Sequence, residues 1–284
     1  MDGPRARRAR AAALSIAASL GLPAKEALVL HDSNKLTLRL LPCDALARVA
    51  PEAEQVAHVE VELAQRLTAA GAPVAALDPR VPPRGYARDG WVVTFWTHYA
   101  PTATTGVPPA GYARALERLH AGLRTLDVPA PHWTERAGRA LRLLSHRDLT
   151  PALADQDRDL LTGTLRDLSR AIRAHGAPDQ PLHGEPHPGN LLATRGGPLF
   201  IDLETVCTGP VEFDLAHAPE AVAAHYPGVD QALLRDCRTL VLAVVTTWRW
   251  DRNDRYPGGH RLGTEWLGRL RAARGGGGPD TGTA

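Results

Sequence analysis

The run His183-Gly184-Glu185-Pro186-His187-Pro188-Gly189-Asn190 restricts the fold of this chain more than any other segment. Proline lacks a backbone N–H and biases the preceding residue toward extended backbone, so Pro186 and Pro188 exclude a continuous helix here. We therefore expect a loop, which presents the carboxylate of Glu185 and the carboxamide of Asn190.

A second carboxylate, Asp202, ends the hydrophobic stretch that follows this loop. That stretch is expected to be a strand. A loop carboxylate can orient or deprotonate an attacking hydroxyl group. An Asn and a strand-end Asp offer the hard oxygen ligands that Mg²⁺ prefers. The set suits phosphoryl transfer from a nucleotide, in which catalysis is mostly positioning and neutralisation of charge.

Other interpretations of these residues stay open. His183 and His187 could form a zinc pair, but their order is not the His-Glu-x-x-His of zinc proteases, and the prolines remove the helix that motif needs. His183 fits a structural residue of the loop better than a base. Asp202 alone would be an ordinary strand-end acid, and Glu204 is interpreted as a hydrogen-bond acceptor rather than a metal ligand.

Composition excludes several classes of protein. The chain has 284 residues, of which 44% are hydrophobic, enough for one large or two modest domains. Its 33 basic and 31 acidic residues give a net charge of +2, so no overall field favours nucleic acid as a partner. Lys25 and Lys35 are the only lysines, and we attribute the arginine bias to a GC-rich genome.

The three cysteines, Cys43, Cys207 and Cys237, are widely spaced and form no Cys-x-x-Cys pair. This pattern favours a reducing compartment, and hence the cytoplasm, over a disulfide framework or a thiolate zinc site. The arginine-rich start and the Ala/Leu run 11–22 indicate an N-terminal helix, with a signal peptide as the alternative. No segment has the apolar length to span a bilayer, so no membrane partner is expected.

Strands and one helix are expected in the first third of the chain. Leu36, Leu38 and Leu40 alternate with more polar residues after a turn cluster at 31–34, which indicates a hairpin with the apolar run 27–30. Further expected elements are strands at 45–49 and 91–99, a helix at 51–70 and a connector at 101–109.

Helices are expected beyond the connector. Leucines at 116, 119, 123 and 126 recur at helical spacing and predict a helix from about 109 to 126. The other expected helices are 134–145, 158–174, 230–249 and 263–273. Residues 274–284, with four consecutive glycines, are expected to be a disordered tail.

The loop and the strand-end Asp resemble the catalytic loop and metal-binding Asp of the aminoglycoside phosphotransferase family. In that family the loop reads His-Gly-Asp-x-His-x-x-Asn, and here only the Asp differs, because Glu185 stands in its place. The resemblance implies an α+β, bilobal, protein-kinase-like fold: an N-terminal lobe of antiparallel sheet plus one helix over 1–98, and a mainly helical C-terminal lobe over 99–273. Patterning alone gives the same order of elements.

The resemblance also implies the chemistry. It makes Glu185 the catalytic carboxylate and Asn190 and Asp202 the ligands of Mg²⁺, with ATP or GTP as phosphoryl donor and a hydroxylated small molecule as acceptor. Arg48 falls where the family has a strand lysine that holds the α- and β-phosphates, and Glu60 where a helix glutamate pairs with that lysine.

Two further segments follow from the same resemblance. One is the turn that covers the phosphates, at Ser33 and Asn34. The other is the hinge strand whose backbone meets the adenine, at Phe95, Trp96 and Thr97. Asp214 matches an Asp that steadies the catalytic loop, and a helix N-cap is the alternative role for it.

Two departures bear on activity. Arg48 presents a broad planar fork in place of a compact ammonium, and Glu185 is one methylene longer than Asp, a shift of about 1 Å for the carboxylate. A catalytically silent nucleotide- or metabolite-binding module of the same fold is therefore an alternative, as is a primary-metabolite kinase of the choline or homoserine type. The Arg48–Glu60 pair could also be a solvated surface pair.

The substrate is expected to be an antibiotic or another hydroxylated natural product, so the activity would inactivate an antibiotic. Acidic and basic residues balance after Thr205, which favours an acceptor less charged than a polycationic aminoglycoside. Four late aromatic residues are interpreted as core or as a stacking wall: Trp248, Trp250, Tyr256 and Trp266. No pattern in the sequence fixes an oligomeric state.

Overall fold

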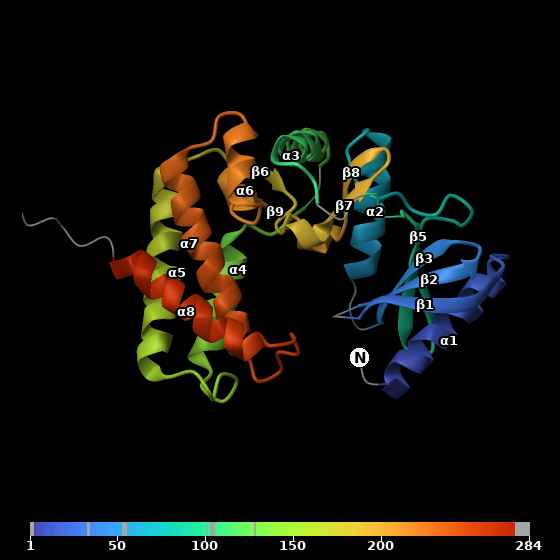
Figure 1. The fold of residues 1–284 in the computed structure, drawn as a ribbon, viewed down its shortest axis with the longest axis horizontal. Helices are drawn as coiled ribbons and strands as arrows, with labels where there is room; N and C mark the ends of the chain where they lie inside the picture. The colour runs from blue at the N-terminus through green and yellow to red at the C-terminus, as the bar shows by residue number, and fades with distance from the viewer. Residues whose placement is uncertain are drawn as a thin grey trace, which may run out of the picture. The chain divides into compact units, whose positions relative to one another are not determined.

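Figure 1 shows the fold in a computed structural model, which describes residues 3–32, 35–52, 56–100, 102, 106–127 and 129–275. The chain forms two compact units, residues 1–128 with 185–206, and residues 129–184 with 207–284. The sequence-based division at residue 98 stays a prediction.

The first unit contains a five-stranded antiparallel sheet in the order β1-β2-β3-β5-β4. The side chains of Leu36, Leu38 and Leu40 are all 0% exposed, because alternation along β2 turns every second residue into the core. The hairpin expected from that alternation is confirmed. The strands are β1 (Ala24–Asp32), β2 (Leu36–Pro42), β3 (Ala45–Pro51), β4 (Tyr86–Arg88) and β5 (Trp91–Thr97).

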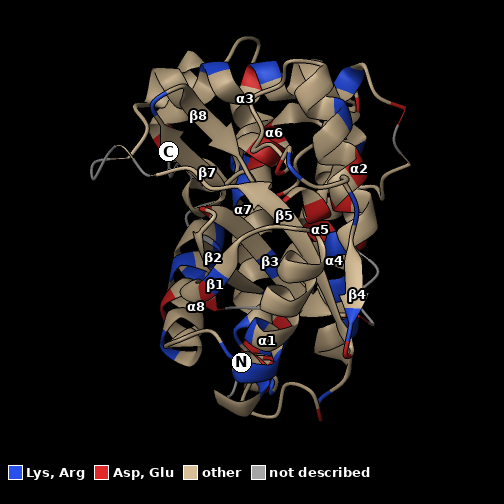
Figure 2. Cartoon of the chain, turned by 90° about the vertical axis from the view of Figure 1, so that its right-hand side faces the viewer, with Lys and Arg blue, Asp and Glu red and all other residues tan. Residues whose placement is uncertain are grey.

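Helix α1 (Gly3–Ser19) packs on this sheet and confirms the expected N-terminal helix. Its small apolar side chains, among them Ala9, Ala13 and Ile16, join the core made by the sheet. Arg7 and Arg8 stay exposed on the opposite side of the helix, and Figure 2 shows the basic residues along α1 in blue.

Helix α2 (Val56–Ala69) begins later than the sequence pattern predicts. Pro51 was expected to open that helix, but it ends β3 opposite Trp91, because the last position of a strand tolerates a residue without an N–H. Helix α3 (Pro109–Arg124) and a hairpin of β7 (Leu191–Thr194) and β8 (Gly197–Phe200) complete the unit. The hairpin joins the body of the unit through a bridge between Val74 and Phe200.

The second unit is mainly helical. Its core is built by the apolar faces of α4 (Thr134–Ser145), α5 (Asp155–His175), α7 (Gln231–Trp248) and α8 (Gly259–Gly275). Helices α5 and α7 lie side by side, and α8 crosses α7. The shorter elements are α6 (Val211–Leu215), a pair of strands, β6 (Gln180–Leu182) and β9 (Cys207–Gly209), and a 3₁₀ turn, η3 (Glu220–His225).

The predicted fold class, α+β with an antiparallel N-terminal sheet and a helical C-terminal part, is confirmed. Among the helices that the structure describes, none is both long enough and apolar enough to cross a membrane. Arg274 and Gly275 end α8 instead of opening the expected tail, and the rest of that tail, 276–284, lies outside the described residues.

Candidate active site

The start of the His183–Asn190 loop is fixed by the carboxylate of Asp214 on α6. Its two oxygens accept the backbone N–H groups of His183 and Gly184, each at 2.8 Å. Asp214 is 0% exposed, so these two charge-assisted hydrogen bonds are shielded from water. Asp214 therefore steadies the loop, and the N-cap alternative is wrong because Pro210 is the N-cap of α6.

The second half of the loop is fixed by hydrogen bonds within the first unit. The hydroxyl of Tyr112, on α3, donates to the carbonyl oxygen of Pro186. The carbonyl oxygen of Glu185 accepts from the His187 N–H at 2.8 Å and from Nδ2 of Asn190 at 3.0 Å. With its nitrogen bound there, the Asn190 amide presents Oδ1 as its acceptor end.

The two histidines of the zinc alternative, His183 and His187, lie in the loop as structural residues. Nδ1 of His187 accepts the N–H of Gly189 at 3.0 Å and so closes the short 3₁₀ turn η1 (Pro188–Asn190). His183 is 0% exposed, as a structural residue of the loop would be.

Asp202 lies beside Asn190 because the hairpin β7–β8 pairs their neighbours. The carbonyl oxygen of Asn190 accepts the N–H of Ile201 at 3.0 Å, and Asp202 is the next residue. The backbone of Asp202 has the left-handed helical conformation (φ 66°, ψ 60°), and this residue precedes the turn η2 (Leu203–Thr205). A non-glycine residue in this region is strained by about 1–3 kcal/mol, and such strain concentrates at functional sites.

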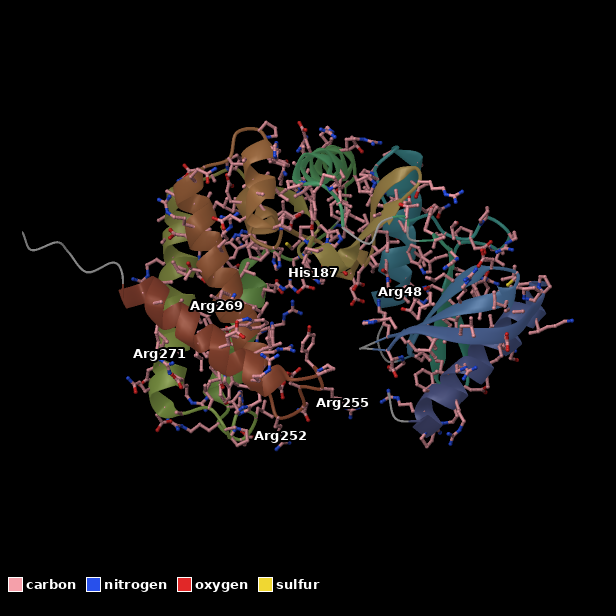
Figure 3. All side chains as sticks on the ribbon, in the orientation of Figure 1. Arg48, His187, Arg252, Arg255, Arg269 and Arg271 are labelled. Atoms are coloured by element: carbon pink, nitrogen blue, oxygen red, sulfur yellow. The ribbon has the colours of Figure 1, made fainter. Side chains whose placement is uncertain are left out.

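Arg48, Glu60 and Asp202 meet in the first unit, from β3, α2 and the end of the hairpin. Nη1 of Arg48 is ion-paired with Oε1 of Glu60, and its Nη2 donates to Oδ1 of Asp202 at 2.7 Å. Glu60 is 1% exposed, so the alternative of a solvated surface pair is wrong. Figure 3 labels Arg48.

Lys35 and Glu204 belong to the same cluster and were not assigned to the site from the sequence. The ammonium of Lys35, the residue before β2, lies 3.2 Å from Oε2 of Glu60 and 4.0 Å from Oδ1 of Asp202, and it is ion-paired with Glu204. Lys35 is 7% exposed. The sequence offered one clue to Lys35: it is one of only two lysines in a chain whose other basic residues, histidine aside, are arginines.

The cluster holds two cations and three carboxylates, and their charges shift the pKa of two members, Arg48 and Glu204. Burial acts to lower the pKa of Arg48, but the charges of Glu60 and Asp202 outweigh it and raise that pKa. Burial raises the pKa of Glu204, as does the charge of Asp202, against the opposing effect of Lys35. Oxygens of Glu60, Asp202 and Glu204 lie within 4.8 Å of one another.

The hinge strand is hydrogen-bonded to the segment 76–78 through the backbone of Phe95 and Thr97. The carbonyl of Phe95 accepts from the N–H of Asp78 at 3.0 Å, and the N–H of Thr97 donates to the carbonyl of Ala76 at 2.9 Å. The indole of Trp96 donates to Thr94 at 2.8 Å. Adenine recognition by this strand stays a prediction.

Ser33 and Asn34, the expected phosphate-covering turn, lie outside the described residues. The late aromatic residues lie in the second unit. Trp250 is 7% exposed and stacks edge-on with His260, at 4.5 Å between centroids, so it is core. The ring of Tyr256 is covered by the guanidinium of Arg249 at 4.5 Å.

The loop before α8 and α8 itself carry more arginines than acids. Several of these side chains pair with acids of α5: Arg271 with Asp157 and Arg274 with Asp167. Within the described chain, Arg252 and Arg255 have no carboxylate partner. Figure 3 labels Arg252, Arg255, Arg269 and Arg271 along this segment.

Comparisons with known proteins agree on one family. A model described as the phosphotransferase enzyme family matches residues 27–239. Among solved structures, an amicoumacin kinase in complex with AMP-PNP, Ca²⁺ and Ami is similar at a TM-score of 0.70 and 11% identity, over 96% of both chains. No curated protein sequence matches the chain.

Two other solved structures are similar at comparable levels. A choline/ethanolamine kinase family protein from Mesorhizobium loti has a TM-score of 0.64 and 19% identity, over 95% of this chain and 94% of that chain. The spectinomycin phosphotransferase APH(9)-Ia, in complex with ADP and spectinomycin, has a TM-score of 0.63 and 12% identity, over 93% and 98%. At these identities the structural likeness shows a shared fold.

Proposed function

This chain belongs to the phosphotransferase enzyme family and is a small-molecule phosphotransferase, and from that premise we propose the reaction it catalyses. It transfers the γ-phosphoryl group of ATP or GTP, with Mg²⁺, to a hydroxyl group of a hydroxylated natural product such as an antibiotic. The transfer inactivates an antibiotic, since it replaces a hydroxyl donor with a group of about −1.5 to −2 charge.

One observation carries the proposal: Arg48, which is ion-paired with the buried Glu60, also contacts Asp202, the residue that follows the hairpin after the loop. A buried cation, Lys35, and a partly buried one, Arg48, lie beside this carboxylate, an arrangement that suits the phosphates of a nucleotide and its metal ion. A phosphoryl group moves through a transition state with charge on its equatorial oxygens, so positioned cations supply most of the catalysis.

Asn190 and Asp202 fit the metal ion by the chemistry of their donors. The amide nitrogen of Asn190 donates to the carbonyl of Glu185, which leaves Oδ1 as the end of the amide that can bind a cation. A carboxamide oxygen and a carboxylate are ligands that Mg²⁺ accepts while it keeps waters and phosphate oxygens. When bound, the ion neutralises charge on the phosphate oxygens.

Glu185 orients the acceptor. Its carboxylate accepts the proton of the substrate hydroxyl as the hydroxyl oxygen bonds to the γ-phosphorus, and the bond to the nucleoside diphosphate breaks. The backbone on both sides of Glu185 is fixed, by Asp214 before it and by Asn190 after it. A shift of the loop backbone by about 1 Å would compensate for the added methylene of Glu185.

The charge of the second unit supports an acceptor less cationic than an aminoglycoside. Acidic and basic residues balance after Thr205, and Arg252 and Arg255 lack acidic partners in the described chain, so this stretch has no acidic excess that would attract a polycation. Arg249 covers the ring of Tyr256, which leaves that face closed to the quaternary ammonium of a choline-type substrate. We therefore prefer a neutral or weakly charged natural product to a choline-type primary metabolite.

We also place the enzyme in the cytoplasm. Cys43, Cys207 and Cys237 are free and buried, as in proteins of reducing compartments. The alternative of a silent binding module keeps the Arg48–Glu60 pair and differs only in turnover, so turnover is the measurement that separates the two.

The test incubates the purified protein with Mg²⁺ and either ATP or GTP against a panel of hydroxylated antibiotics, and mass spectrometry detects acceptors that gain one phosphate group. Glu185→Gln is tested in parallel, with Glu117→Gln, an exposed change on α3, as the matched control. An adduct that is lost only in Glu185→Gln supports the proposal. Nucleotide binding without transfer to any panel member would favour the silent module.

A further inference from the structure

Two cations, not one, share the buried glutamate of helix α2. Oε1 of Glu60 pairs with Arg48 of β3, and Oε2 with Lys35, the residue before β2. Glu60 is 1% exposed, so its charge is offset by these two neighbours with little help from water. The resemblance to the phosphotransferases requires one cation at this glutamate, so one of the two has a role that remains to be assigned.

Arg48 is bound as a structural brace. Its two terminal nitrogens are each engaged by a different carboxylate, Glu60 and Asp202, in the planar geometry that a guanidinium imposes. These contacts connect β3, α2 and the end of the hairpin. If Arg48 turned toward a phosphate, both carboxylates would lose a hydrogen-bond donor.

The ammonium of Lys35, unlike the guanidinium of Arg48, is free to change partners. An ammonium is a compact charge whose three donors can rotate, so it can change one partner without losing the others. Glu60 holds it on the buried side, while its other close partner, Glu204, has a side chain that is 23% exposed and can turn into solvent. Lys35 also directly follows residues 33–34, the predicted phosphate-covering turn.

We propose that Lys35 is the cation that binds the phosphate oxygens of the nucleotide, and that Arg48 holds Glu60 and Asp202 in position. In the absence of nucleotide, Glu204 pairs with the ammonium; when the nucleotide binds, a phosphate oxygen replaces Glu204 while Glu60 stays in place. The charge usually supplied from the third strand is thus supplied from the second. This inference rests on the proposed function, because it assigns a residue to the nucleotide of that reaction.

Calorimetry with Mg²⁺ and ATP or GTP tests the assignment on the full chain. Lys35→Met should weaken nucleotide binding by about 10- to 100-fold, the range for loss of a hydrogen bond to a charged group. Arg48→Lys loses the two-pronged contact to Glu60 and Asp202 but keeps a positive charge, so it should weaken nucleotide binding less than Lys35→Met does. Lys25→Met, which removes the other lysine at an exposed position on β1, is the matched control and should bind normally.

Two further variants keep the result independent of misfolding. Lys35→Met/Glu204→Gln removes both partners of one ion pair and leaves Glu60 paired with Arg48, and it should still bind weakly. Lys35→Met/Arg48→Lys places the ammonium on β3, and it should regain most of the affinity, which a purely structural role for Lys35 would not allow. Thermal unfolding confirms that each variant is folded.

The outcomes separate the two proposals. If the parent binds neither nucleotide, the proposed function fails and this inference fails with it. If the parent binds a nucleotide and the folded Lys35→Met variant binds equally well, only the assignment of Lys35 is overturned. Loss of binding in Arg48→Lys with normal binding in Lys35→Met would show that Arg48, not Lys35, binds the phosphates.

Discussion

Asn190 donates from its side-chain nitrogen to the backbone carbonyl of Glu185 at 3.0 Å, so one hydrogen bond joins the proposed metal ligand to the proposed catalytic residue. The bond fixes which end of the amide faces outward. It also couples the position of the metal ion to that of the carboxylate that orients the acceptor.

Asn190→Asp tests this coupling, because it keeps an oxygen ligand but removes the donor. The Mg²⁺ concentration for half-maximal turnover should rise about 10- to 100-fold, as when a group that orients a ligand is lost. Stability should fall by only about 0.5–1.5 kcal/mol. Asn253→Asp, in the exposed loop before α8, is the control. An unchanged Mg²⁺ dependence in Asn190→Asp would show that the hydrogen bond does not position the metal ligand.

Asp214→Asn should destabilise the protein by about 1.5–3 kcal/mol, because an amide replaces one of two buried oxygens that accept the His183 and Gly184 N–H groups. The new NH₂ group faces an N–H donor, which leaves that donor without an acceptor. Urea unfolding measures the loss, with the exposed Asp159→Asn of α5 as control. Equal unfolding midpoints for the two variants would contradict the anchoring role.

Gly122 and Gly163 lie within α3 and α5, and an added methyl group should act in opposite directions at the two sites. A Cβ at Gly122 would lie 2.7 Å from Cβ of Ala72, whereas at Gly163 it meets nothing within 4 Å. Gly122→Ala should therefore cost about 1–3 kcal/mol through overpacking. Gly163→Ala should gain about 0.5–1 kcal/mol through helix propensity. Thermal unfolding measures the stability of both variants, and a change of the same sign in both would refute the packing argument.

The pH dependence of stability should carry a contribution from Asp78, which is 2% exposed. Burial acts to raise its pKa, but hydrogen bonds from the side chain and backbone of Arg80 outweigh burial and lower it. A carboxyl group with a lowered folded pKa stabilises the fold above its unfolded value of about 3.9, and that contribution is lost as pH falls through the folded pKa.

The measurement compares parent and Asp78→Asn by urea unfolding from pH 7 to the acid limit. The difference in free energy of unfolding should be constant from pH 7 down to about pH 4 and shrink at lower pH, because protonated Asp78 resembles the amide. A difference that stays constant through the acid range would mean that Arg80 does not stabilise the ionised form.

Periodicity predicted the long elements because burial imposes it. Helix α4 matches its predicted bounds, and the alternation of Leu36, Leu38 and Leu40 predicted β2. Three-residue strands such as β4, β6 and β9 are shorter than the period that would reveal them. Pro51 was assigned to a helix because prolines often open helices, yet its pairing partner Trp91 lies too far along the chain for a local pattern to show.

The residues of the candidate site also fall into those that a local sequence pattern predicts and those that it does not. The sequence predicted Glu185, Asn190 and Asp202 because a short loop and a strand carry them together. Lys35 was not predicted as a site residue, because its partners, Glu60 and Glu204, are distant in the sequence and come close to it only in the folded chain. The number of lysines in the chain was a clue, but composition says nothing about what a side chain contacts.

Glu60 pairs with Arg48 on β3 and with Lys35 just before β2, and this double pairing bears on how such enzymes evolve. A lineage that carries both cations on Glu60 can lose or exchange one of them while the other still balances the buried charge. The phosphate-binding residue can then migrate from one strand to its neighbour through active intermediates. Surveys that score this family by the identity of a single strand position would count such a descendant as inactive, although its ammonium has only moved to the adjacent strand.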